Sequence, residues 1–298
     1  MQNLIMRPSH CAVKKLLIFM IALTLVACGA VRIGFNNGEI VSYWWLNSYV
    51  DFEDAQKPWV KSHIEDLFAW HHKTQLRDYV KLVSRTQHRD LATVSKMDLL
   101  ADYEEGKKHI MQITDRAAPE LADLALSLTS EQITNIEEKL AKNNTKFRKE
   151  YLSGDKAARQ EFRYKKMMKQ AEYWFGGFSR AQEQKLRALS DVRPLNNELV
   201  LADRMRRQSE LVALLKRIRN EKPNKEAATV MIKKYIAATM DHYGNKEQQA
   251  FFDALTDANA GLVAEMMHMA TPDQKSHFIR TLQDWISDFN RLSAKAAS

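Results

Sequence analysis

The sequence predicts an all-α protein, built as a multi-helix bundle or array. Among 298 residues there are only 9 Gly and 6 Pro, which is too little turn chemistry for many short strands. Leu, Ala, Glu, Gln, Lys and Met, which favour helices, are abundant. Apolar residues recur at helical spacing almost everywhere, and no alternating stretch is long enough to require a sheet.

Residues 1–27 have the composition of an export signal that precedes this helical part. Arg7, Lys14 and Lys15 form a cationic region, and an apolar run follows from Leu16 to Ala27. About a dozen apolar residues are too few for a bilayer core that needs roughly 20. We therefore expect a cleaved signal rather than a membrane-spanning anchor.

The end of the signal, Leu25-Val26-Ala27-Cys28, resembles the lipobox of bacterial lipoproteins. Small Ala27 suits the cleavage subsite, and the thiol of Cys28 suits transfer of a diacylglyceryl group. The resemblance implies cleavage between these two residues, triacylation of Cys28 and durable anchoring without a spanning helix. Gly29, where Asp would retain the protein, implies the periplasmic face of the outer membrane of a Gram-negative bacterium. The alternative is a plain secretory signal with an accidental cysteine.

Cysteine count and charge limit the expected partners. Cys11 lies inside the signal, so Cys28 is the single cysteine of the mature chain and no disulfide framework is possible. The formal charge of +8 falls to about +5 when the signal is removed. An exported chain rarely meets nucleic acid, so we expect none. The expected partners are the membrane, through the lipid anchor, and an envelope protein or anionic envelope polymer.

Residues 28–40 are predicted to be a lipidated N-terminus and tether, and 41–298 an all-helical domain with a possible division near 176–194. The tether is followed by a dense aromatic cluster, in which Trp44, Trp45 and Tyr49 are candidates for contact with a partner or with the membrane interface. The alternative, which the spacing favours, is a first helix that buries Trp45, Tyr49 and Phe52 on one face.

Two stretches in this region, YWWLNSYVDFEDAQ from Tyr43 and WHHKTQLRDY from Trp70, resemble a proteobacterial family of all-helical lipoproteins whose activity is unknown. The chain departs from the family pattern at Asn47 and Glu53, where the family has Asp. The resemblance therefore implies localisation and fold, and it implies no activity.

The later helices follow from caps, breaks and periodicity. We expect a helical pair at 63–72 and 76–84, in which Thr74 caps the second helix. Ser95 is expected to cap a helix through Ile113, and Pro119 to begin a separate short helix. Further helices are expected where apolar stripes recur: from Thr129 to Tyr151, 156–175 up to Gly176-Gly177, 195–219 before Pro223, 226–243, 246–269 and 272–295.

A short frame recurs at several of these helix starts: LTSEQ at 128–132, FSRAQ at 178–182, ATPDQ at 270–274 and, more loosely, FEDAQ at 52–56. Its hydroxyl and glutamine positions are those of a capping box, which explains the recurrence without a function. The frame also resembles the Leu-Thr-x-x-Gln stretches of small periplasmic stress chaperones. That resemblance implies a helical cradle for unfolded envelope proteins.

Catalytic signatures are lacking in the sequence, so we expect a protein without enzymatic activity, metal or cofactor. Ser153-Gly-Asp-Lys156 matches a Ser-x-x-Lys pattern without its companion motifs and is interpreted as a helix connection. His71 and His72 are the candidates if the chain is an unrecognised enzyme. Adjacent histidines point about 100° apart on a helix, which disfavours a shared metal ion. Met266-Met267-His268-Met269 is interpreted as core rather than as a copper site.

Several basic residues, with Arg204, Arg206 and Arg207 foremost, are candidates for partner contact. Acidic residues interleave with them, which favours ordinary solvated helix faces over a dedicated anion-binding patch. The sequence thus predicts a noncatalytic binding or structural module of the cell envelope. The first alternative is a chaperone-like cradle, and the second is an enzyme that uses His71 or His72.

Overall fold

A computed structural model confirms the all-α prediction. It describes residues 35–240 and 244–296, and in these ranges it contains eleven helices and no strand. The helices are α2 (Gly38–Val50), α3 (Lys57–Thr74), α4 (Leu76–Gln87), α5 (Lys96–Ser127), α6 (Ser130–Tyr151), α7 (Lys156–Phe175), α8 (Arg180–Asp191), α9 (Asn197–Glu221), α10 (Lys225–Met240), α11 (Lys246–His268) and α12 (Pro272–Lys295).

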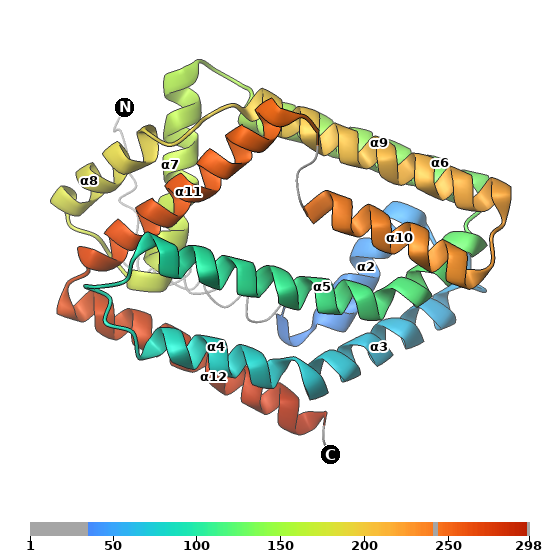
Figure 1. Cartoon of the computed structure of the whole chain (residues 1–298), viewed down its shortest axis with the longest axis horizontal. Helices are drawn as coiled ribbons and strands as arrows, with labels where there is room; N and C mark the ends of the chain where they lie inside the picture. The colour runs from blue at the N-terminus through green and yellow to red at the C-terminus, as the bar shows by residue number, and fades with distance from the viewer. Residues whose placement is uncertain (1–34, 241–243, 297–298) are drawn as a thin grey trace, which may run out of the picture.

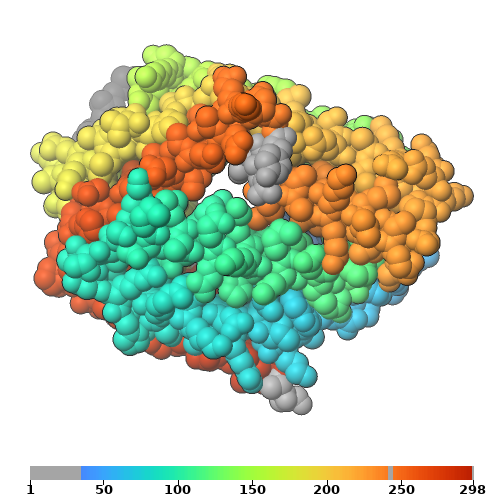
Figure 2. Space-filling model, viewed as in Figure 1, coloured from blue at the N-terminus to red at the C-terminus, as the bar shows by residue number. Residues whose placement is uncertain are grey.

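The helices form a closed ring (Figure 1). Helices α6 and α9 pack together along one long side, and α4 packs on α12 along the other. Helices α7 and α8 lie at one end, and α11 and α10 return across the ring to pack on α5. Figure 2 shows an opening between α11, α5 and α10, where these helices line a cavity of about 640 Å³.

Two main clusters of buried side chains hold the ring together. One draws on α2, α3, α5, α6, α9 and α10, and the other on α7, α8, α11, α12 and the segment around Leu91. Each cluster combines segments from before and after the predicted division near 176–194. That division remains a prediction.

Helix α5 runs unbroken through Pro119, so the prediction of a separate short helix beginning there is wrong. A proline inside a helix removes one backbone hydrogen bond and costs roughly 3 kcal/mol. Packing outweighs this cost, because Ala118, Ala122 and Ala125 are almost fully buried in the first core cluster. Small side chains let α10 lie close along this part of α5.

Most predicted helix boundaries are confirmed. Ser95 begins α5 with a capping box, α7 ends at Gly176, whose φ is 76°, and α9 ends just before Pro223. The predicted cap at Thr74 is wrong. Its hydroxyl donates instead to a carbonyl of α3 at 2.8 Å, and Gln75 precedes α4 without a side-chain cap.

Candidate functional site

An open groove of about 680 Å³ lies between α7, α11 and α12. Its volume is in the range of protein ligand sites. In Figure 1, α11 crosses in front of α7 while α12 runs below both. The lining is mainly apolar and includes Met167 and Trp174 of α7, Met266 and Met267 of α11, and Phe278 of α12.

The groove follows from the way α7 packs. This helix buries one face against the second core cluster, through Tyr164, Met168, Ala171 and Phe175. Met167 and Trp174 lie beside that face and remain partly exposed. Helices α11 and α12 approach α7 without covering these two side chains, so they form a wall of the groove.

Aromatic contacts fix the geometry of the groove near Gly176. The rings of Phe175 and Phe278 are stacked, with centroids 4.9 Å apart and planes 8° apart. Trp174 lies 6.1 Å from Phe278, measured between ring centroids. Helices α7 and α12 therefore pack together through these rings at this end of the groove.

Two arginines line the groove together with its apolar side chains. Arg193 donates to the side-chain oxygens of Asn259 (2.7 Å) and Ser190 (3.0 Å). Arg163 donates to the carbonyls of Ser190 (2.6 Å) and Pro194 (2.8 Å). Burial, and then the positive charge of Arg163, lower the pKa of Arg193 to about 10. Both side chains stay charged at neutral pH, so the groove is apolar and locally cationic.

The recurring glutamine frame does more than cap helices. The capping box at Thr129 is confirmed, since its N–H donates to Gln132 Oε1 (3.1 Å) and its hydroxyl accepts from the Gln132 N–H (3.2 Å). In addition, Nε2 of Gln132 donates to Gln56 Oε1 at 2.6 Å and to the Asp51 carbonyl at 3.3 Å. This partly buried contact joins the start of α3 to the start of α6.

A second glutamine pair has the same arrangement. Nε2 of Gln182 donates to Gln274 Oε1 (2.8 Å) and to the Met269 carbonyl (3.0 Å). Nε2 of Gln274 donates to the Gly177 carbonyl at 2.7 Å. This pair joins α8 to α12 at the opposite end of the ring from the first pair (Figure 1). Sequence reasoning missed the pairing, although the shared glutamine position was its visible signal.

Helix α2 does not bury the face that its spacing predicts. Phe52 is buried, but the exposed fractions of Trp44 and Trp45 are 65% and 59%. The prediction that Trp45 belongs to a buried face with Phe52 is therefore wrong. The reason is local: α2 ends at Val50, and Asp51 is left-handed with φ 57°, so Phe52 no longer follows the helical spacing.

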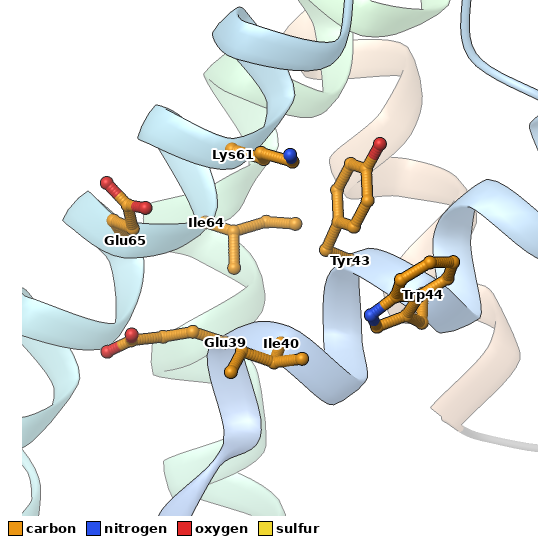
Figure 3. Close-up of a pocket in the computed structure, with 7 residues that line it drawn as sticks. All are labelled: Glu39, Ile40, Tyr43, Trp44, Lys61, Ile64 and Glu65. Carbon is orange, nitrogen blue, oxygen red and sulfur yellow. The ribbon is translucent and has the colours of Figure 1, made fainter.

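The aromatic cluster divides between the core and the surface. Figure 3 shows Tyr43 of α2 facing Lys61 and Ile64 of α3. Trp44 also lines this small cleft, which has a volume of about 270 Å³. Tyr49 is partly buried, and its hydroxyl accepts from the Asn143 side chain at 2.8 Å. An internal hydrogen bond thus engages Tyr49, whereas the rings of both tryptophans lie largely in solvent.

The histidine pair lies at the edge of the core. Burial, and then the charge of His72, lower the pKa of His71 to about 4, so its ring is neutral at neutral pH. Its Nε2 lies 3.2 Å from the Tyr79 hydroxyl. A histidine next to a phenol lacks the adjacent carboxylate that orients many catalytic histidines. Within the described ranges, no group of three potential metal ligands is found.

Arg204, Arg206 and Arg207 form contacts within the protein. Asp203 is fully buried and accepts ion pairs from Arg206 (2.7 Å) and Arg207 (2.6 Å). Arg204 donates to Asn144 Oδ1 at 2.9 Å. The three candidate cations therefore lie around polar groups of α6 and α9, and burial of Asp203 explains their clustering in the sequence.

The remaining sequence motifs lie in a helix connection, in the core or outside the described residues. Ser153 donates to the Lys149 carbonyl (2.6 Å), in the turn where Asp155 caps α7. Met266 and Met267 are buried in the second core cluster. Ala27 and Cys28, the predicted cleavage and lipidation residues, lie outside the described residues. Among the helices of the described ranges, none has the length and hydropathy needed to cross a bilayer.

A model of a family of unknown function, DUF6279, matches residues 48–242. The chain belongs to this family. The matched region begins in α2 and contains the first glutamine pair and the α7 side of the groove. Membership in DUF6279 agrees with the expected resemblance to a family without a known activity. No curated protein and no solved structure matches this DUF6279 protein.

The DUF6279 chain thus brings together side chains suited to binding. Methionine is flexible and polarizable, so the partly exposed Met167 can adapt to apolar partners of different shape, beside the buried Met266 and Met267. Arg163 and Arg193 donate to internal oxygens, so they favour a nearby carboxylate or phosphate through their positive charge. Sequence reasoning named Met266 and Met267 only as core and missed the groove, because its walls come from helices about 100 residues apart.

Proposed function

We propose that this DUF6279 protein is a noncatalytic binding module of the cell envelope. In this proposal, lipid on Cys28 anchors the chain to the outer membrane, and the helical ring faces the periplasm. The observation that carries the proposal is the apolar groove between α7, α11 and α12, with its methionine lining. The lipobox-like sequence at Leu25–Cys28 supports the anchor.

The lining indicates the chemistry of the partner. A row of apolar side chains, as on an amphipathic helix, matches the surface formed by Met167, Trp174 and Val263. An acidic residue on the same segment would meet Arg163 and Arg193. The proposed ligand is therefore an apolar polypeptide segment with a carboxylate, presented by an envelope protein.

A chaperone-like cradle is the second candidate function. The observation that favours it is the pairing of Gln56 with Gln132 and of Gln182 with Gln274. The pairing gives the resemblance to Leu-Thr-x-x-Gln chaperones a structural role beyond local capping. Methionine-rich surfaces also suit promiscuous binding. The two functions differ in their clients: one folded partner for the binding module, and many unfolded chains for the chaperone.

Crosslinking tests the groove directly. A photo-reactive residue replaces Gln170, an exposed side chain of the groove, in the full-length protein in intact cells. The binding module predicts one recurrent adduct, whereas the chaperone predicts many unfolded envelope proteins. Met167→Glu in the same chain should remove either kind of adduct, because it places a charge in the apolar wall.

A matched control uses Val230, which is exposed on α10 outside the groove. Val230→Glu adds the same charge and should leave the adducts of the Gln170 probe unchanged. If Met167→Glu and Val230→Glu have equal effects, the groove is not the binding surface.

A further inference from the structure

Helix α2 presents an apolar face that no other described helix covers. Ile40, Val41, Trp44 and Trp45 are all more than half exposed, at 58%, 51%, 65% and 59%. These positions lie on adjacent turns of one side of the helix. The helix packs on α3 and α6 mainly through Tyr43, Leu46, Tyr49 and Val50, and one edge of the exposed face, at Ile40 and Trp44, lines the cleft toward α3. Four large apolar residues on one exposed stripe are unusual for a surface that faces only water.

The composition of this stripe suits a lipid interface. Tryptophan is enriched at the level of the headgroups, where its ring is partly apolar and its N–H remains hydrated. The face ends at Ser48, whose hydroxyl donates to the Trp45 carbonyl at 2.8 Å. The stripe is thus short and lies in the first three turns of α2, toward the N-terminal side of the described chain.

Cations flank α2 on both sides. The ammonium group of Lys61, from α3, lies 4.9 Å from the ring centroid of Tyr43. The ammonium group of Lys139, from α6, lies 5.6 Å from that of Tyr49. Lysines beside an apolar, aromatic face are the arrangement that interfacial helices use toward anionic headgroups.

The number of residues between Cys28 and α2 limits how far the exposed apolar face of α2 can lie from the membrane. Cys28 precedes Gly38, the first residue of α2, by ten positions. Ten residues span at most about 35 Å when fully extended. A lipid on Cys28 would therefore keep α2 close to the membrane surface. A bilayer is the apolar surface that is always present at that distance.

We propose that α2 lies on the bilayer, with the side chains of Ile40, Val41, Trp44 and Trp45 in the headgroup region. This inference rests on the proposed anchor at Cys28. The contact fixes the orientation of the ring relative to the membrane, since α2 is held between α3 and α6. A lipid anchor alone would leave the ring free to rotate, whereas a second contact restrains it.

Fluorescence quenching tests the contact. The full-length lipidated protein is reconstituted into vesicles of phosphatidylethanolamine and phosphatidylglycerol with bromine on the upper acyl carbons. Bromine quenches tryptophan at close range, and the chain has 6 tryptophans. We expect quenching in the wild type, and we expect Trp44→Phe with Trp45→Phe to remove most of it. Trp174→Phe, in the groove, is the matched control and should leave the absolute quenched intensity unchanged.

The outcomes separate the contact from the anchor. Wild-type protein that floats with the vesicles but shows no bromine quenching overturns the contact and leaves the anchor intact. Equal effects of the double variant and Trp174→Phe also overturn the contact. Cell fractionation tests the anchor by itself: if Cys28→Ala stays in the membrane fraction, the anchor at Cys28 is wrong, whatever the quenching shows.

Discussion

Replacing Gln132 by Ala tests whether the glutamine frame joins distant helices or only caps one. Gln132 is buried, and its side chain takes part in four hydrogen bonds: one from the Thr129 N–H in its own helix start, one to the Asp51 carbonyl, and two with the Gln56 side chain, one in each direction. A cap alone predicts a small loss of stability. A contact that joins α3 to α6 predicts a larger loss of stability, which depends on the presence of Gln56.

The expected loss follows from these bonds. Losing a helix cap costs about 1 kcal/mol. Each further intramolecular hydrogen bond contributes about 1 kcal/mol net, and more when its removal leaves a buried group unpaired. Gln132→Ala removes the reciprocal cap bond and leaves the Asp51 carbonyl without this donor. We therefore expect the free energy of unfolding to fall by about 3 kcal/mol.

Urea unfolding, followed by circular dichroism, measures this loss through the midpoint of the transition. Asp98 supplies a matched control, because it occupies the same position in the capping box of Ser95 and is exposed. Its carboxylate accepts locally, from the N–H (2.9 Å) and the hydroxyl (2.6 Å) of Ser95. Asp98→Ala should lower the midpoint less than Gln132→Ala does, because it removes only a local cap. A double-mutant cycle of Gln56→Ala with Gln132→Ala should give a coupling energy of about 1 kcal/mol.

Two results would refute the reasoning. One is a loss for Gln132→Ala no greater than that for Asp98→Ala. The other is a coupling energy near zero between Gln56 and Gln132, since two residues that do not interact have additive effects. Either result would reduce the frame to a helix cap.

Three further predictions concern other parts of the chain. Asp203→Ala should lower the free energy of unfolding by about 3 kcal/mol, because Arg206 and Arg207 lose the buried carboxylate that pairs with them. Asp203→Asn should lower it less, and urea unfolding measures the difference between the two variants. Because the pKa of His71 is lowered from 6.5 to about 4, the unfolded chain takes up a proton on this ring at a higher pH than the folded chain does. The free energy of unfolding should therefore fall by at most about 2 kcal/mol between pH 7 and pH 5. His71→Gln should reduce this dependence of the free energy of unfolding on pH. Met167→Glu should weaken the fluorescence of an apolar dye that binds in the groove. An unchanged signal would show that the dye binds elsewhere on the protein.

Much of the fold is predictable because local signals agree with the tertiary structure. Ser95, Thr129, Ser179 and Thr271 all cap helices as their sequence context predicts. Pro119 is one exception, since its effect depends on burial of nearby alanines in the core, which no local pattern contains. Propensity is a weak prior, and packing outweighs it in this helix.

The candidate site is harder to predict for the same physical reason. Periodicity identifies which face of a helix is apolar, but it does not say what covers that face. Spacing assigns Trp45 and Phe52 to one buried face, yet the left-handed Asp51 takes Phe52 out of the helical spacing, and only Phe52 is buried. Likewise the sequence pattern presents Arg206 and Arg207 as surface charges, because the burial of Asp203 cannot be seen in sequence.

The most direct test of the proposed function is photo-crosslinking from Gln170 in intact cells, read out by identification of the captured segment. The account predicts adducts to apolar polypeptide segments, lost with Met167→Glu and kept with Val230→Glu. A single recurrent protein would establish a dedicated partner, and a broad set of unfolded envelope proteins would establish the chaperone. Adducts that survive Met167→Glu would contradict a binding role for the groove.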